Sequence, residues 1–161
     1  MSTFSRFDTP IGRCAIAWDG DVIVGVRLPD ASFDGSGPLT PPGWVQGVID
    51  AIVASLRGEA DDLADIPLDL DGLPPFRRRV YDVVRTIPAG ETMSYGEVAA
   101  AAGSPGAARA VGQAMAQNPF PLIIPCHRVL AAGGKVGGFT ASGGTDTKLR
   151  MLAVEGVRPA G

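Results

Sequence analysis

The sequence contains one histidine, His127, and two cysteines, Cys14 and Cys126, which lie far apart in the chain. A lone histidine excludes a histidine-based metal site. The two cysteines have neither the spacing of metal ligands nor the number that a disulfide framework needs. We therefore expect no metal and no other cofactor, and two thiols that stay reduced in a cytosolic protein.

Long apolar runs are absent as well. No stretch approaches the ~20 residues of a membrane-spanning helix, and residues 1–10 lack the basic segment and apolar core of a secretory signal. We expect a cytoplasmic, soluble monomer with no membrane partner. The 161 residues, 45% of them hydrophobic, suffice for one ordinary domain or two small ones.

Net charge is small, at −3, but unevenly distributed. Residues 1–71 carry four arginines against twelve acidic residues, a net charge of −8, whereas residues 72–161 carry ten basic against five acidic residues, a net charge of +5. A basic half joined to an acidic one suits a module that meets phosphates through one face. Charge also fluctuates along chains without functional meaning, so the pattern alone leaves both interpretations open.

The first half has the pattern of a small antiparallel sheet covered by a helix. Residues 13–19 and 22–28 are rich in strand formers, and Asp19-Gly20 between them is typical of a tight hairpin. A loop rich in Gly, Pro and Ser follows at 29–43. Apolar residues then recur at helical spacing until Gly58.

We place a domain boundary at residue 72. Residues 59–71 are acidic and look like a last strand and a linker. The prediction is an α/β N-terminal domain of structural role, residues 1–72, followed by a mainly helical domain, residues 73–161.

The second half begins with two helices. Pro74-Pro75 starts an apolar helical series that ends before Pro88. Residues 94–97, Ser-Tyr-Gly-Glu, form a capping box, which predicts a helix from Tyr95 to about Ala102.

A further helix completes a helix-turn-helix. Gly103 turns the chain, Ser104 and Pro105 start the next helix, and Asn118-Pro119 ends it. This helix is rich in Ala and Gly, which permits close approach to another surface, either within the domain or at DNA. Arg109 has no obvious partner on it and could reach into a groove.

An apolar run over residues 121–130 is interrupted by Cys126-His127-Arg128. Gly133-Gly134 then turns the chain toward residues 135–139, which predicts a β-hairpin. A hairpin after a helix-turn-helix is a wing, so we expect a winged helix-turn-helix domain.

The last predicted helix starts at Thr145 or Asp146 and ends at Gly156. Glu155 lies three residues after Leu152 and continues its apolar stripe, so the carboxyl group should be partly buried and hydrogen-bonded. Most glutamates near a helix end are surface residues, which is the alternative.

Cys126 is the best candidate for a nucleophile. A cysteine reacts as thiolate, and a neighbouring histidine is a common means of generating it. Adjacent side chains on an extended backbone point to opposite faces, so His127 would act through a water or a local bend. Glu155, if it points inward, would hold the imidazole. Cys14, by contrast, has the pattern of inert packing.

Residues 73–156 resemble the catalytic domain of the O6-alkylguanine-DNA alkyltransferases, also called methylated-DNA:protein-cysteine methyltransferases. Residues 1–71 resemble the family's variable N-terminal domain only in layout. The resemblance is carried by the motifs at residues 87–92, 94–97, 107–112, 118–119, 124–129 and 143–144, with Lys148, Leu152 and Glu155.

The resemblance implies direct repair of DNA, in which an alkyl group moves irreversibly from O6 of guanine to Cys126, once per molecule. O4-alkylthymine is a further possible substrate. His127 would activate Cys126 through a water and Glu155 would orient His127. Tyr95 would donate a hydrogen bond to the base, and Asn118 would brace the active-site turn.

The partner implied is double-stranded DNA that contains O6-alkylguanine. The helix that bears Arg109 would enter the minor groove, and Arg109 would fill the gap left by the flipped nucleotide. The carbonyls of Cys126 and Val129 would recognise the guanine amino group. Residues expected to contact substrate or DNA are Arg109, Ala110, Met115, Arg128, Val129, Thr140, Ser142 and Gly143.

Two features depart from the resemblance. Relatives with a zinc site build it from Cys and His in the N-terminal domain, where this chain has no histidine. Residues 139–144 are about two residues longer than the commoner form. Either the amide of Thr140 or that of Ser142 would then meet the guanine O6.

Two other classes of function are alternatives. A winged-helix DNA binder without transfer activity would lack the cysteine, whereas Cys126 is present. A papain-like hydrolase would have its histidine far from the cysteine in sequence and no helix-turn-helix.

Overall fold

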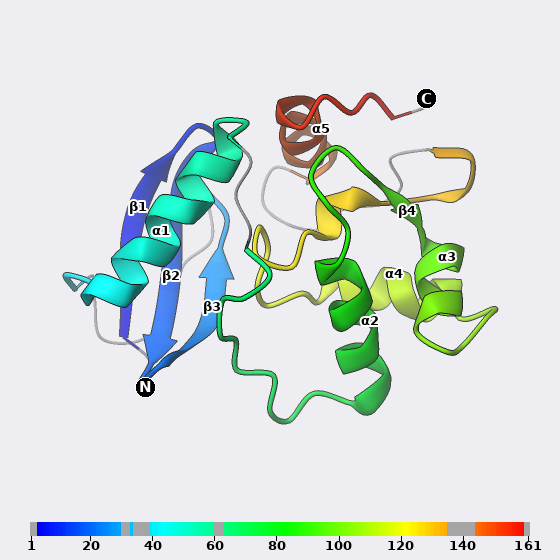
Figure 1. Cartoon of the computed structure of the whole chain (residues 1–161), viewed down its shortest axis with the longest axis horizontal. Helices are drawn as coiled ribbons and strands as arrows, with labels where there is room; N and C mark the ends of the chain where they lie inside the picture. Colours follow the sequence, from blue (N-terminus) through cyan, green and yellow to red (C-terminus); the bar gives the residue numbers. More distant parts are fainter. Residues whose placement is uncertain (1–2, 30–32, 34–38, 60–62, 135–143, 160–161) are drawn as a thin grey trace. The chain divides into compact units, whose positions relative to one another are not determined.

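The computed structural model describes residues 3–29, 33, 39–59, 63–134 and 144–159 (Figure 1). The chain forms two compact units. Unit 1 consists of Met1–Asp69 and Pro119–Ile123, and unit 2 of Leu70–Asn118 and Ile124–Gly161.

Unit 1 contains a three-stranded antiparallel sheet in the order β1-β2-β3. The strands are β1 (Thr3–Thr9), β2 (Gly12–Asp19) and β3 (Val22–Arg27), and the turn between β2 and β3 contains Gly20 at φ 60°. The predicted hairpin is therefore present. The strand β1, which pairs with β2 along its whole length, was not predicted.

The last strand predicted within residues 59–71 is much reduced. In the described part of this segment, Leu68 makes an isolated parallel bridge to Ile23. The amide of Ile23 donates to the Pro67 carbonyl and that of Asp69 to the Ile23 carbonyl, each at 2.9 Å. Pro67 has no amide hydrogen, so pairing cannot extend through it.

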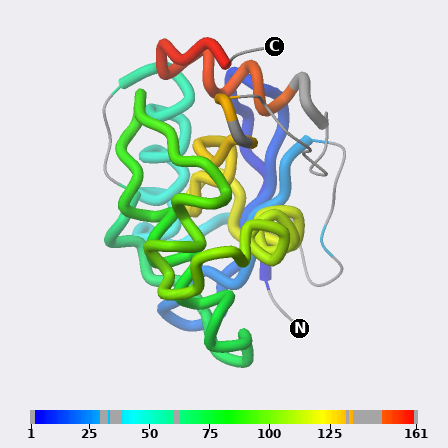
Figure 2. Tube along the Cα trace, turned by 90° about the vertical axis from the view of Figure 1, so that its right-hand side faces the viewer, coloured from blue at the N-terminus to red at the C-terminus, as the bar shows by residue number. Residues whose placement is uncertain are grey.

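One helix, α1 (Gly43–Leu56), covers a face of this sheet, as the two views in Figures 1 and 2 agree. Its buried residues recur at helical spacing and form the apolar stripe that the sequence predicted: Val45, Val48, Ile49, Ile52 and Leu56.

Unit 2 begins with α2 (Pro75–Arg85), α3 (Tyr95–Ala101) and α4 (Ala108–Ala116). Pro75 occupies the first turn of α2, where its missing amide hydrogen costs nothing. The hydroxyl of Tyr81 in α2 donates to the Ala114 carbonyl in α4 at 2.8 Å, and Arg79 donates to the Ala102 carbonyl after α3 at 3.0 Å. Helix α2 thus fixes both helices that follow it.

The capping box at the start of α3 is formed as predicted, with Ser94 Oγ accepting from the Glu97 amide at 3.0 Å and Glu97 Oε1 accepting from the Ser94 amide at 2.9 Å. The predicted start of the next helix is wrong. Gly106 adopts φ 90°, so the helix begins only at Ala108, after a turn closed by the Ala107 amide and the Ser104 carbonyl.

The apolar run at 121–130 is not an extended strand. It contains the 3₁₀ turn η1 (Cys126–Arg128) and the short strand β5 (Val129–Leu130), which pairs in parallel with β4 (Met93–Ser94). A second 3₁₀ turn, η2 (Ala132–Gly134), follows. Residues 135–143, where the wing was predicted, lie outside the described residues.

The last helix is α5 (Gly144–Val154). It ends as predicted, with Gly156 at φ 78° and the Val157 amide donating to the Leu152 carbonyl. Within the described residues, no helix combines the length and hydropathy that crossing a bilayer requires.

Candidate active site

Cys126 opens the turn η1 and is 5% exposed. Its amide donates to the Ile124 carbonyl at 2.7 Å. This local bend replaces the extended backbone expected from the sequence. The rule that successive side chains of a strand point to opposite faces therefore does not apply to Cys126 and His127.

Asn118 braces the chain that leads to Cys126. Its side-chain amide donates to the Ile124 carbonyl at 2.9 Å, which links the two positions where the chain leaves and re-enters unit 2. Between them, Leu122 adopts φ 77°, a conformation that non-glycine residues rarely take. The predicted bracing contact of Asn118 is present.

The thiol and the imidazole both favour their neutral forms. Burial raises the pKa of Cys126, which the hydrogen bond of Asn118 and the charge of Lys148 only partly oppose. Burial also lowers the pKa of His127, in spite of the opposing effect of Glu155. Cys126 therefore rests as a thiol and needs a base to become a nucleophile.

His127 and Glu155 lie together, as the helical spacing of Glu155 predicted. Nε2 of His127 is 3.2 Å from Oε2 of Glu155, and their side chains are 5% and 6% exposed. Nδ1 of His127 is buried and has no hydrogen-bond partner among the described residues. The imidazole thus contacts the carboxylate through one nitrogen and keeps the other available.

Glu155 is a carboxylate at neutral pH. Burial acts to raise its pKa, but hydrogen bonds from His127 and Arg128, with their charges, outweigh burial and lower the pKa to about 2.

Arg128, which was predicted to contact substrate or DNA, makes the contacts described here within the protein. Its guanidinium donates to both oxygens of Glu155 and to the Ile87 carbonyl, and its side chain is 12% exposed. These contacts hold the guanidinium in place, and a contact of Arg128 with substrate or DNA remains a prediction.

Lys148 was part of the motif pattern, but no role was predicted for it. It is 2% exposed, and its Nζ donates to the Val129 carbonyl at 2.8 Å and lies 6.0 Å from the centre of the Tyr95 ring. Burial lowers the pKa of Lys148 to about 8. Its position four residues before Leu152, on the stripe that also holds Glu155, could have indicated an inward side chain.

Tyr95, the first residue of α3, is half-buried. Burial raises the pKa of its phenol, and the nearby Cys126 raises it further. The hydroxyl group therefore stays protonated at neutral pH and can donate a hydrogen bond.

Helix α4, which Figure 2 views nearly along its axis, has an exposed face and a buried one. Arg109 is exposed and Ala110 half-exposed, as expected for residues that face DNA. Met115 is buried with Val111 and Ala114. A contact of Met115 with substrate or DNA remains a prediction.

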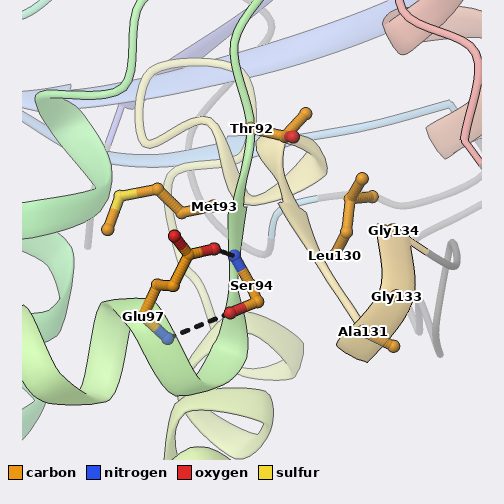
Figure 3. A pocket seen from close by; sticks show the side chains of 8 residues that line it. All are labelled: Thr92, Met93, Ser94, Glu97, Leu130, Ala131, Gly133 and Gly134. Carbon is orange, nitrogen blue, oxygen red and sulfur yellow. Dashed lines mark hydrogen bonds between the residues drawn. The ribbon is translucent and has the colours of Figure 1, made fainter.

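A cavity of about 320 Å³ lies beside the β4–β5 pair (Figure 3). Its lining includes both capping-box residues, Ser94 and Glu97, and none of the predicted site residues; the full set is Thr92, Met93, Ser94, Glu97, Leu130, Ala131, Gly133 and Gly134.

Three residues predicted to contact the substrate, Thr140, Ser142 and Gly143, lie outside the described residues. In the described part of the chain, no three His, Cys, Asp or Glu side chains are grouped so as to hold a metal ion. The absence of a metal remains a prediction.

Comparison with known proteins identifies the family. The family model described as 6-O-methylguanine DNA methyltransferase, DNA binding domain, matches residues 75–157. A methylated-DNA–protein-cysteine methyltransferase of Mycolicibacterium paratuberculosis is 41% identical over 157 residues, which cover 96% of this chain and 93% of the relative. The chain belongs to the methylated-DNA–protein-cysteine methyltransferase family.

A solved structure and a second relative are also similar to this chain. A crystal structure of Mycobacterium tuberculosis OGT in complex with DNA is similar with a TM-score of 0.80 and 39% identity, covering 96% of this chain and 93% of that one. A Thermus thermophilus relative, 41% identical over 92% of this chain and 96% of its own, is named a DNA base-flipping protein.

Proposed function

We propose that this protein repairs DNA by transferring a methyl or other alkyl group from O6 of guanine to Cys126, irreversibly and once per molecule. The observation that carries the proposal is that the buried Cys126 is followed in the chain by the buried His127, whose Nε2 contacts Glu155. The methyltransferases to which the chain is similar support the choice of reaction.

The proton of Cys126 passes to Nδ1 of His127, directly or through a water. The sulfur then forms a bond to the alkyl carbon as the bond from that carbon to O6 breaks, and the electron pair stays on guanine. Guanine takes up one proton and His127 releases the one that it received, so that the protons balance, while the hydroxyl of Tyr95 donates a hydrogen bond to the leaving base. The thioether has no labile group, so the acceptor is consumed.

DNA binding is assigned to residues 73–161. In this proposal α3 and α4 form a helix-turn-helix, the segment at 135–139 forms the wing, and α4 enters the minor groove. Arg109 fills the gap left by the flipped base, since flipping costs a few kcal/mol that new contacts must offset.

The carbonyls proposed to recognise the guanine amino group are those of Cys126 and Val129. Both already accept one hydrogen bond, from the Val129 amide and from Lys148 respectively. Each carbonyl has a second lone pair for the ligand. The amide of Thr140 or that of Ser142 would meet O6, and Gly143 would contact the substrate or DNA.

The remaining assignments complete the proposal. Residues 1–72 serve as a structural N-terminal domain, and the protein acts as a cytoplasmic monomer.

A second candidate function is base flipping without transfer, and the name of the Thermus relative favours considering it. The two functions differ at Cys126, which flipping does not need.

The experiment is mass spectrometry of the Cys126 peptide after incubation with duplex DNA containing O6-methylguanine. We expect one methyl group per protein on Cys126, in a single burst. Cys126→Ser should abolish the burst, because a hydroxyl is a far poorer nucleophile than a thiolate. Cys14→Ser is the matched control: Cys14 is buried in β2 with its pKa raised by burial, and the burst should persist. Turnover beyond one methyl, or methyl on Cys14, would refute the proposal.

A further inference from the structure

The guanidinium of Arg128 is held by groups on two elements. Nε donates to the two oxygens of Glu155 at 3.0 and 3.1 Å, and Nη2 donates to Oε2 at 2.5 Å. Nη1 donates to the carbonyl of Ile87, just beyond the end of α2, at 2.8 Å. Arg128 therefore anchors the carboxylate of Glu155 to the end of α2.

This anchoring determines what Glu155 can do for His127. A carboxylate with both oxygens accepting from a guanidinium has no proton to donate. The remaining contact of Oε2, with Nε2 of His127 at 3.2 Å, must then have the imidazole as donor. The hydrogen of a neutral His127 lies on Nε2, so that Nδ1, buried and without a partner among the described residues, carries the free lone pair.

We propose that Arg128 is a positioning residue for His127: by holding both oxygens of Glu155, it fixes the imidazole in the Nε2–H tautomer and leaves Nδ1 as the base for the Cys126 proton. Its meaning for catalysis rests on the proposed alkyl transfer. The tautomer and its dependence on Arg128 can be measured without DNA.

Three charged groups act on the imidazole, and Cys126 is its titratable neighbour on η1. Glu155, beyond the end of α5, favours the protonated ring, whereas Arg128 on η1 and Lys148 on α5 oppose it. Without Arg128, the full charge of Glu155 would act on His127 alone. The ring would then take up a proton at higher pH and lose its acceptor.

The test is ¹⁵N NMR of the imidazole, and it is unambiguous because His127 is the only histidine in the chain. In the unmodified protein we expect a neutral ring at pH 7, with Nε2 protonated and Nδ1 not. Arg128→Met should raise the titration midpoint of His127 by about one pH unit or more, the size of shift that a nearby charge produces. The acid limb of the pH profile for reaction with O6-benzylguanine should move with it.

Arg128→Lys keeps a positive charge but not the fork that holds both oxygens, so we expect a smaller shift in the same direction. This variant also keeps the test open if Arg128→Met does not fold. Arg78→Met, on an exposed position of α2, is the matched control and should leave the titration unchanged.

An Nδ1–H tautomer in the unmodified protein would overturn the inference, as would a midpoint that stays the same in the folded Arg128 variants. Failure of the proposed function would look different. Cys126 of the unmodified protein would carry no methyl group, whatever the imidazole spectrum shows.

Discussion

At the scale of single residues, the candidate reactive pair could be selected from the sequence but its geometry could not. Cys126 and His127 stand out because they interrupt an apolar run. The 3₁₀ turn that holds them follows a segment that is hydrogen-bonded by Asn118 and contains Leu122 at a positive φ, and no periodicity reveals these features. The contact of Arg128 with Glu155 was not predicted, because the two residues lie 27 positions apart and only tertiary folding joins them.

Glu155 should make stability depend on pH in the acid range. Its pKa in the folded protein, about 2, lies below its ordinary value of 4.5. The stability that it contributes is fully present above pH 4.5 and is lost as pH falls from there toward 2. Glu155→Gln leaves Arg128 without its charged partner and should lower the free energy of unfolding at pH 7 by about 3 kcal/mol.

Urea unfolding at several pH values measures this effect. The difference between the two proteins should shrink as the pH is lowered from 4.5. Glu91→Gln, at an exposed position, is the control and should cost little at any pH. An equal deficit for Glu155→Gln at pH 7 and pH 3 would contradict the role given to its charge.

At the scale of elements, local features were predicted well and long-range features poorly. The capping box of α3 involves side chains and amides within four residues, so the sequence contains all of it. The strand β1 needs β2 to pair with, and its apolar residues do not alternate strictly. Helix α4 starts later than predicted, because Gly106 has a positive φ and forms a turn where Ser104 and Pro105 predicted a helix.

The exposed face of α4 gives a prediction of its own. Arg109→Ala should slow repair of duplex DNA by about tenfold or more, because a flipped base must be replaced in the stack and flipping costs a few kcal/mol. Reaction with free O6-benzylguanine needs no flipping and should be nearly unchanged. Rates on the two substrates, measured in parallel, test the difference.

Arg78→Ala in α2 removes another exposed arginine from the same unit and serves as the control. Equal losses on duplex and free base in Arg109→Ala would show that Arg109 does not act as the plug.

At the scale of the whole molecule, the uneven charge should govern binding to undamaged DNA. Residues 72–161 carry +5 and residues 1–71 carry −8, so attraction to phosphates comes from one half only. We expect weak binding whose association constant falls with salt, with a slope of about −0.9 per phosphate contact on a double-logarithmic plot. Fluorescence anisotropy over a salt series would measure it, and a flat response would exclude phosphate-driven binding.

The chain path has a consequence for dissection of the molecule. The backbone passes from one unit to the other after Asp69, after Asn118 and after Ile123. A fragment that starts at residue 73 would keep Pro119–Ile123 but lose β3, whose Val26 amide donates to the Pro119 carbonyl. The fragment would also keep the buried side chains of Phe120, Leu122 and Ile123 without the rest of unit 1, to which they belong. Cys126 follows the segment Pro119–Ile123 by three residues. The two units are interdependent in topology, because neither can be excised as one uninterrupted stretch of polypeptide.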